Sequence, residues 1–260
     1  MSRRLLLAIL ASSSCLVSCQ TVWMESIERL ELNSEGIREL YCNSRDGRIE
    51  LVGDPETDKI TVSVRKAVGG VDPEDARAAM AALQIVNESS EGRMHLGHRW
   101  LAGSQRDWRS SVSFRVVYPR DLNTLVETRN GDIRIRGARG RCTATSRSGS
   151  IEVQGALAWT RIRTRTGRVG ARLSSGGGRK KFTCDIVTLD GSVSLVLDRG
   201  ASSRVSCATA SGVLDCNLPL RKFSIKRRSI GGTLGSGLGS VTIRTQSGGI
   251  RLQTRSATFE

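Results

Sequence analysis

The segment "TATSRSGSIEVQG" (residues 143–155) carries the pattern that decides the fold. A turn at Ser148-Gly149 separates two short runs in which apolar or small residues alternate with polar ones. Related segments stand on either side, "VETRNGDIRIRG" (126–137) and "RIRTRTGRVGAR" (161–172). Alternation with a period of two predicts strands with one buried and one solvent-facing side. We therefore expect two short β-strands joined at a glycine turn, and several copies of this unit.

Alignment of the chain on its turn glycines reveals seven such units. The glycines are Gly47, Gly131, Gly149, Gly167, Gly191, Gly212 and Gly248. An aliphatic residue stands two positions after each glycine, and a serine or threonine stands three positions before it. A meander of hairpins would produce the alternation but would not require the same residue class at each offset, whereas stacked coils would. The pattern predicts an all-β fold, a β-solenoid with stacked short-strand coils of about 18–24 residues.

One segment departs from the strand pattern. "VDPEDARAAMAALQIVNESSEG" (71–92) predicts an inserted helix over about 72–86, with Asp72 as N-cap and Pro73 in the first turn. Ala76, Met80 and Leu83 form its apolar stripe. We expect this helix to cap the first coils, because an open sheet end needs cover.

The repeat also resembles a known family. "FRVVYPRDLNTLVETRNGDIRIRG" (114–137), the S-G-x-I and T-G-x-V units after it, and "GLGSVTIRTQSGGIRL" (237–252) are similar to the bacterial "putative adhesin" family. The resemblance implies a β-solenoid surface domain over residues 27–254, followed by a tail at 255–260. It also implies a non-enzymatic structural or adhesive module without a cofactor, and it names no ligand.

The first twenty residues, "MSRRLLLAILASSSCLVSCQ", have the order of a secretory signal: Arg3 and Arg4, a short apolar core, then small residues. The core is too short to span a bilayer. Its end, Leu16 to Cys19, resembles the lipobox of bacterial lipoproteins. This resemblance implies removal of residues 1–18, lipidation at Cys19, and a membrane-anchored linker at 19–26. Because Gln20 is not aspartate, it also implies the outer membrane of the cell envelope.

Arginines form the second pattern. The position two before the turn glycine holds Arg45, Arg129, Arg147 and Arg165, and the last three fall on consecutive coils, with Arg163 also facing outward. The net charge of +15 falls to about +13 without Arg3 and Arg4. Two hypotheses follow: a solvated face of the repeat, which we favour, or a binding site for anionic envelope or host glycans, including lipopolysaccharide. Nucleic acid is disfavoured, because residues 120–220 contain only Trp159 and Phe182 as aromatic residues for base stacking.

The remaining candidates for chemistry are weak. His95 and His98 have no nearby third ligand and are expected to be loop residues, so no metal site is predicted. The cysteines of the repeat region fall mostly in inward columns, where a thiol acts as a small apolar group. They are Cys42, Cys142, Cys184, Cys207 and Cys216.

A polysaccharide-active β-helix enzyme is the third hypothesis, but such chemistry needs converging carboxylates. The acids of the coils, Asp132, Glu152, Asp185, Asp198 and Asp215, occupy scattered offsets. We expect no catalytic residues and no cofactor, and the oligomeric state stays open.

Overall fold

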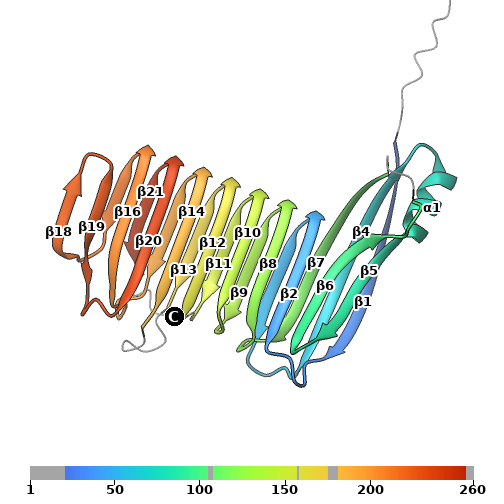
Figure 1. Cartoon of the computed structure of the whole chain (residues 1–260), viewed down its shortest axis with the longest axis horizontal. Coiled ribbons are helices and arrows are strands. Elements are labelled where there is room, and N and C mark those ends of the chain that lie inside the picture. The colour runs from blue at the N-terminus through green and yellow to red at the C-terminus, as the bar shows by residue number, and fades with distance from the viewer. Residues whose placement is uncertain (1–20, 105–107, 157, 175–180, 256–260) are drawn as a thin grey trace, which may run out of the picture.

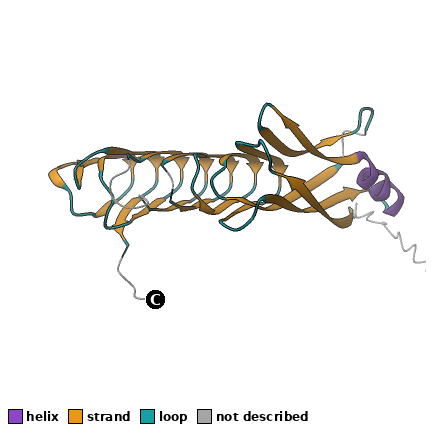
Figure 2. Cartoon of the chain, turned by 90° about the horizontal axis from the view of Figure 1, so that it is seen from below, coloured by secondary structure: helices purple, strands orange, loops and turns teal. Residues whose placement is uncertain are grey.

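The fold consists of two facing sheets and one helix. The computed structural model describes residues 21–104, 108–156, 158–174 and 181–255. The strands follow one another along the long axis of an elongated molecule, and they form two layers that lie face to face (Figures 1 and 2). The all-β prediction is confirmed.

Both sheets are mixed, with parallel pairs along most of their length. Sheet A contains, in spatial order, β1 (Val22–Asn33), β4 (Lys59–Gly70), β7 (Arg109–Pro119), β3 (Ile49–Asp54), β9 (Ile133–Ala138), β11 (Ile151–Gly155), β13 (Val169–Leu173), β15 (Val193–Leu197), β21 (Ile250–Thr254) and β17 (Leu214–Asn217). Sheet B contains β18 (Arg221–Lys226), β19 (Ser229–Leu234), β16 (Ser203–Ser211), β20 (Gly239–Ser247), β14 (Thr183–Asp190), β12 (Trp159–Thr166), β10 (Cys142–Ser148), β8 (Asn123–Asn130), β2 (Glu39–Asp46), β6 (Arg93–Trp100) and β5 (Leu83–Ser90).

Each turn glycine joins a strand of sheet B to a strand of sheet A, and we call such a strand pair a repeat unit. Neighbouring units pair in parallel without a shift of register at the turn. Ala144 of β10 lies between Val126 of β8 and Ile162 of β12. In sheet A, Ile151 of β11 is aligned in the same way with β9 and β13. The aligned apolar residues point inward and form one continuous core between the sheets.

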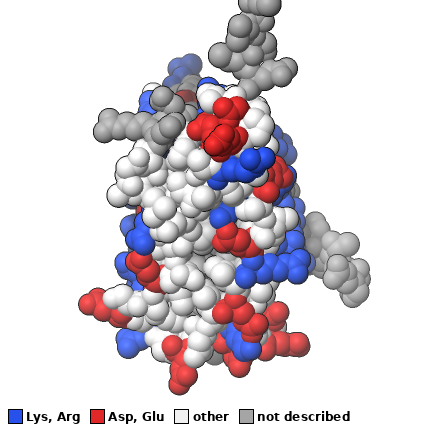
Figure 3. Space-filling model, turned by 90° about the vertical axis from the view of Figure 1, so that its right-hand side faces the viewer, with Lys and Arg blue, Asp and Glu red and all other residues white. Residues whose placement is uncertain are grey.

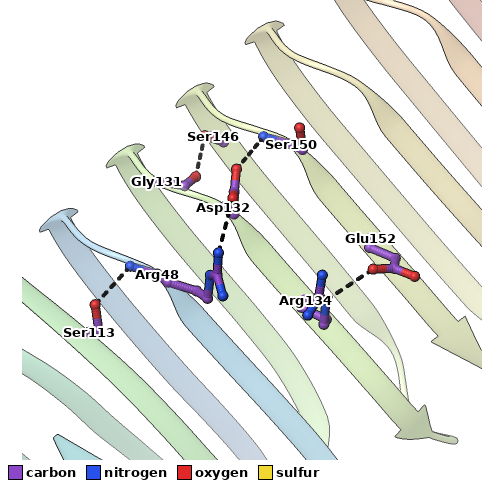
Figure 4. Close-up of polar contacts among 8 residues, drawn as sticks. All are labelled: Arg48, Ser113, Gly131, Asp132, Arg134, Ser146, Ser150 and Glu152. Carbon is purple, nitrogen blue, oxygen red and sulfur yellow. Dashed lines mark hydrogen bonds and ion pairs between the residues drawn. The ribbon is translucent and has the colours of Figure 1, made fainter. Parts of the chain in front are cut away.

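The glycine and hydroxyl columns have a common structural cause, which is the close approach of successive turns. A Cβ atom on Gly149 would lie 2.1 Å from the carbonyl oxygen of Gly131, and the other turn glycines meet the same obstacle. The buried Ser146 hydroxyl donates to that Gly131 oxygen at 3.3 Å (Figure 4), and Thr209 donates to Gly248 at 3.0 Å. Four of the seven column hydroxyls thus tie a turn to its neighbour, those of Ser146, Thr164, Thr209 and Thr245.

The spatial order of the units differs from their order in the sequence. The unit of Gly248 lies between those of Gly191 and Gly212, because β20 pairs in parallel with both β14 and β16. The preceding stretch, where the columns lose register, contains an antiparallel hairpin of β18 and β19 that pairs with β16. This hairpin ends sheet B, and every residue of β18 is exposed.

The other end of the molecule is an antiparallel block. Here β1, β4 and β7 extend sheet A, β5 and β6 extend sheet B, and the two layers diverge toward the helix (Figure 2). Helix α1 (Pro73–Ala82) is capped by Asp72 as predicted and packs mainly against β4 and β1. The predicted helix range of 72–86 was too long, because Leu83 begins β5. Strand β1 begins at Val22, within the expected linker 19–26, and Cys19 lies outside the described residues.

Candidate functional site: an arginine groove

A groove opens where β6 leaves β2. The two strands pair only from Glu39 to Cys42, opposite Arg93 to Leu96. Beyond this pairing, their ends and the start of β7 border a groove of about 1040 Å³. We call it the arginine groove, and its main lining residues are Arg45, Arg99, Arg109, Arg129, Arg147, Arg165, His98, Trp100 and Trp108.

The arginine column of the sequence lies along this groove. Arg129, Arg147 and Arg165 occupy β8, β10 and β12, and their side chains are exposed. Arg45 extends the column by one strand, because β2 pairs with β8 in the same register. Four successive strands therefore present a guanidinium at the same position.

Three of these four arginines form no ion pair within the described ranges. Arg45 lies 3.7 Å from Asp46, but Arg129, Arg147 and Arg165 form no ion pair with any residue in the described part of the chain. The outer face of sheet A differs, since Arg134 pairs with Glu152 at 3.0 Å (Figure 4). The arginine column thus keeps its capacity to bind external anions.

The column has defined ends. On β14 the equivalent position holds Leu189, which is 37% exposed. Arg163, our fourth candidate for anion binding, is exposed on β12 but does not line the groove. The structure therefore groups Arg129, Arg147 and Arg165 with Arg45 and separates them from Arg163.

Two tryptophans lie at the β6 end of the groove, and no pattern in the sequence associates them with the arginines. The rings of Trp100 and Trp108 have centroids 5.6 Å apart and planes inclined by 41°. The indole nitrogen of Trp108 donates to Asp75 Oδ1 of α1 at 2.7 Å, which fixes the orientation of this ring. Both side chains are only partly buried, so they contribute apolar surface beside the arginines.

Both histidines lie in β6, so the prediction that they are loop residues was wrong. His95 stacks on Tyr41 with ring centroids 4.8 Å apart, and it lies 3.2 Å from Asn43 Oδ1. His98 lines the groove, and burial lowers its pKa, against the opposing effect of Asp46. Across the residues that the structure describes, no three His, Cys, Asp or Glu side chains gather in a way that could hold a metal ion.

The five cysteines belong to the interior and not to the groove. Cys42, Cys142, Cys184 and Cys207 are buried in the core, Cys216 is partly buried, and all five are free thiols. Burial raises the pKa of Cys142 to about 11 and that of Cys207 to about 12. Cys142 and Cys207 therefore stay protonated and act as apolar packing groups.

Charge is distributed unevenly along the molecule. Residues 21–104 contain 15 Asp and Glu against 10 Lys and Arg, whereas residues 108–255 contain 8 against 27. Figure 3 views the antiparallel end, where acidic and basic side chains are mixed on the surface. The positive charge is thus concentrated on the stacked units, where the arginine column lies.

Comparisons with known proteins add the following. The sequence matches no protein-family model, and no curated protein matches it. The fold is similar to that of a "putative cell adhesion protein" from Clostridium sporogenes, with 11% identity, a TM-score of 0.47, and coverage of 89% of this chain and 100% of that chain. It is also similar to a "putative adhesin" from Bacteroides fragilis, with 8% identity, a TM-score of 0.40, and coverage of 87% and 97%. Within the described ranges, no helix has the length and apolar character needed to cross a membrane.

Proposed function

We propose that this protein is a lipid-anchored β-solenoid of the bacterial cell envelope that binds an anionic polymer, without catalysis, through the arginine groove. The parallel, in-register pairing of the repeat units supports the solenoid assignment. The lipobox-like segment ending at Cys19 supports the anchor, and Gln20 supports the outer membrane as its location.

The observation that carries the proposal is the column of four guanidiniums in one groove, three of them without an ion pair in the described chain. Guanidinium groups hold carboxylates, sulfates or phosphates through two parallel hydrogen bonds. Like charges on neighbouring strands repel one another, so a bound polyanion would relieve this repulsion and release its own counter-ions. A groove with these properties suits an extended anionic polymer.

The state of the acidic residues supports a binding role over hydrolysis. Most acids of the repeat units form ion pairs with arginines, whereas glycoside hydrolysis uses two carboxylates that flank the bond to be broken. The pairs are Asp132 with Arg48, Glu152 with Arg134, Asp185 with Arg161, and Asp215 with Arg251. These four carboxylates are each paired with an arginine and do not line the groove. The two acids that do line it are also engaged, Asp46 with Arg45 and Glu127 with the Tyr41 hydroxyl.

The binding proposal can be tested with variants that keep the charge. Replacing Arg129, Arg147 and Arg165 with lysine retains three positive charges but removes the two-point contacts. We expect the affinity for heparin and for polygalacturonate, measured by calorimetry at about 0.15 M salt, to fall roughly tenfold or more.

A matched control replaces three exposed arginines of the sheet A side, Arg136, Arg168 and Arg172, with lysine. This variant should bind like the parent. Equal affinities for the parent and both variants, lost together in moderate salt, would show that only the overall charge attracts polyanions.

The anchor is tested separately. Cys19→Ala should move the protein from the membrane to the soluble fraction or leave an unprocessed precursor, because acyl chains supply the membrane affinity. A processed Cys19→Ala protein that still partitions into detergent would contradict lipidation.

A further inference from the structure

The spacing of the arginine column suggests which anionic polymer it fits. The four arginines lie on adjacent strands, and neighbouring strands are about 4.8 Å apart. This separation is close to the length of one pyranose residue in an extended polysaccharide. A chain that runs along the stack and carries one carboxylate per sugar therefore matches the column in axial spacing, with one carboxylate for each guanidinium.

The groove also offers hydrogen-bond acceptors that the hydroxyl groups of a sugar polymer can use. Asp46 and Glu127 lie among the arginines, and Tyr41 already donates to Glu127 Oε2 at 3.0 Å. Carboxylates accept hydrogen bonds from sugar hydroxyls, whereas they repel a hydroxyl-free polyanion such as inorganic polyphosphate. The combination of arginines and interspersed acids thus favours a hydroxylated, moderately charged polymer.

The tryptophans continue the same track beyond Arg45. Trp100 and Trp108 provide a partly buried apolar surface at this end of the groove, and the bond from Trp108 to Asp75 holds one ring in place. The apolar C–H face of a sugar ring can pack on such a surface. At the opposite end, Leu189 ends the arginine column.

We propose that the arginine groove binds a linear polyuronic acid along the stack, with one sugar on each of the four column arginines and one further sugar against Trp100 and Trp108. This inference rests on the proposed function, because it presumes that the groove binds anionic polymers. It adds the class of ligand, its direction and the length of the site.

Galacturonate oligomers of two to eight sugars test the inference by calorimetry. Affinity should increase several-fold with each added sugar up to about five, one per column arginine plus the tryptophan position, and then level off. Arg165→Gln removes the outermost arginine, so the affinity should level off one sugar earlier. Arg163→Gln, at the other exposed arginine of the same strand, should leave the length at which the affinity levels off unchanged. Trp108→Leu should weaken binding of the five-sugar oligomer, and Trp159→Leu, outside the groove, should not. Thermal unfolding of each variant checks that the fold is intact.

The outcomes separate the two proposals. If heparin, polyphosphate and single-stranded DNA bind as tightly as polygalacturonate, and no plateau follows the arginine count, the groove binds polyanions but the polyuronate inference is wrong. If none of these polymers binds with a dependence on Arg129, Arg147 and Arg165, the proposed function itself fails. Methyl-esterified oligomers that bind as well as the free acids would also overturn the inference, because they lack the carboxylates.

Discussion

The turn glycines provide the sharpest test of how the repeat units stack, and Gly149→Ala is the most informative substitution. Gly149 has φ of +148°, a region that residues with a side chain rarely adopt, and this alone costs about 1–3 kcal/mol. The new Cβ would also lie 2.1 Å from the Gly131 oxygen and 2.6 Å from its carbon, far inside van der Waals contact.

Relief of this overlap requires the two turns to separate. The backbone bonds from Gly131 N to Ser148 O and from Ile133 N to Ser150 O, both at 2.9 Å, would lengthen. Each such bond contributes about 0.5–1.5 kcal/mol, so with the backbone strain we expect a total destabilisation of about 2–6 kcal/mol. This is a large fraction of the stability of a typical domain.

The assay is the free energy of unfolding in urea, followed by circular dichroism, with Gly170→Ala as the matched control. Gly170 lies on β13 in the next unit, where a Cβ would meet only Glu152 Cγ at 4.0 Å. Alanine there should be neutral or stabilise the fold by up to about 1 kcal/mol. If Gly149→Ala were no more destabilising than Gly170→Ala, the reasoning on close turns would be refuted.

Three further predictions concern the interior and the groove. Ile151→Asp should unfold neighbouring units, because Ile151 is 1% exposed, whereas Arg163→Asp on the outer face should change the urea midpoint little; equal losses would reverse our assignment of faces. The four buried cysteines should resist alkylation at pH 8 in the native protein and react in urea, which mass spectrometry can count; rapid native labelling would contradict their burial. Because burial lowers the pKa of folded His98 below the usual 6.5, the unfolded chain binds the proton more readily, and stability should fall as the pH drops through 6.5. His98→Gln should lose that part of the pH dependence of the unfolding free energy, and identical pH profiles for the two proteins would exclude the effect.

The repeat unit could be predicted from the sequence because its determinants are local. Glycine, the hydroxyl residue and the inward aliphatic residues recur at fixed offsets, and each is required by contact with the next unit. The order of the units could not be predicted, because the Gly191, Gly212 and Gly248 units present equivalent columns to a neighbour. The β18–β19 hairpin, which separates two of these units, has no counterpart in the repeat pattern.

The candidate site was predictable in part for the same reason. The arginine column follows from the offset two before each turn glycine, and three of its members were expected to stack. Arg45 could not be placed in this column from the sequence, because its strand β2 is far from β8 in the chain. Asn130 of β8 donates a hydrogen bond to Asp46 of β2, and 84 residues separate the two. Trp100 and Trp108 come from the antiparallel block, whose position against β2 depends on packing around α1 and β4 and on no repeated pattern.

The placement of β20 and β21 between units that precede them in the sequence also affects how the chain reaches its native state. Ribosomes release β14 and β16 before β20, yet the edges of β14 and β16 pair only through β20. Transiently exposed strand edges can pair incorrectly during folding, and β16 carries the same columns as β20. Direct docking of β16 on β14 would therefore be a well-matched but incorrect pairing, and it would have to open before β20 could enter.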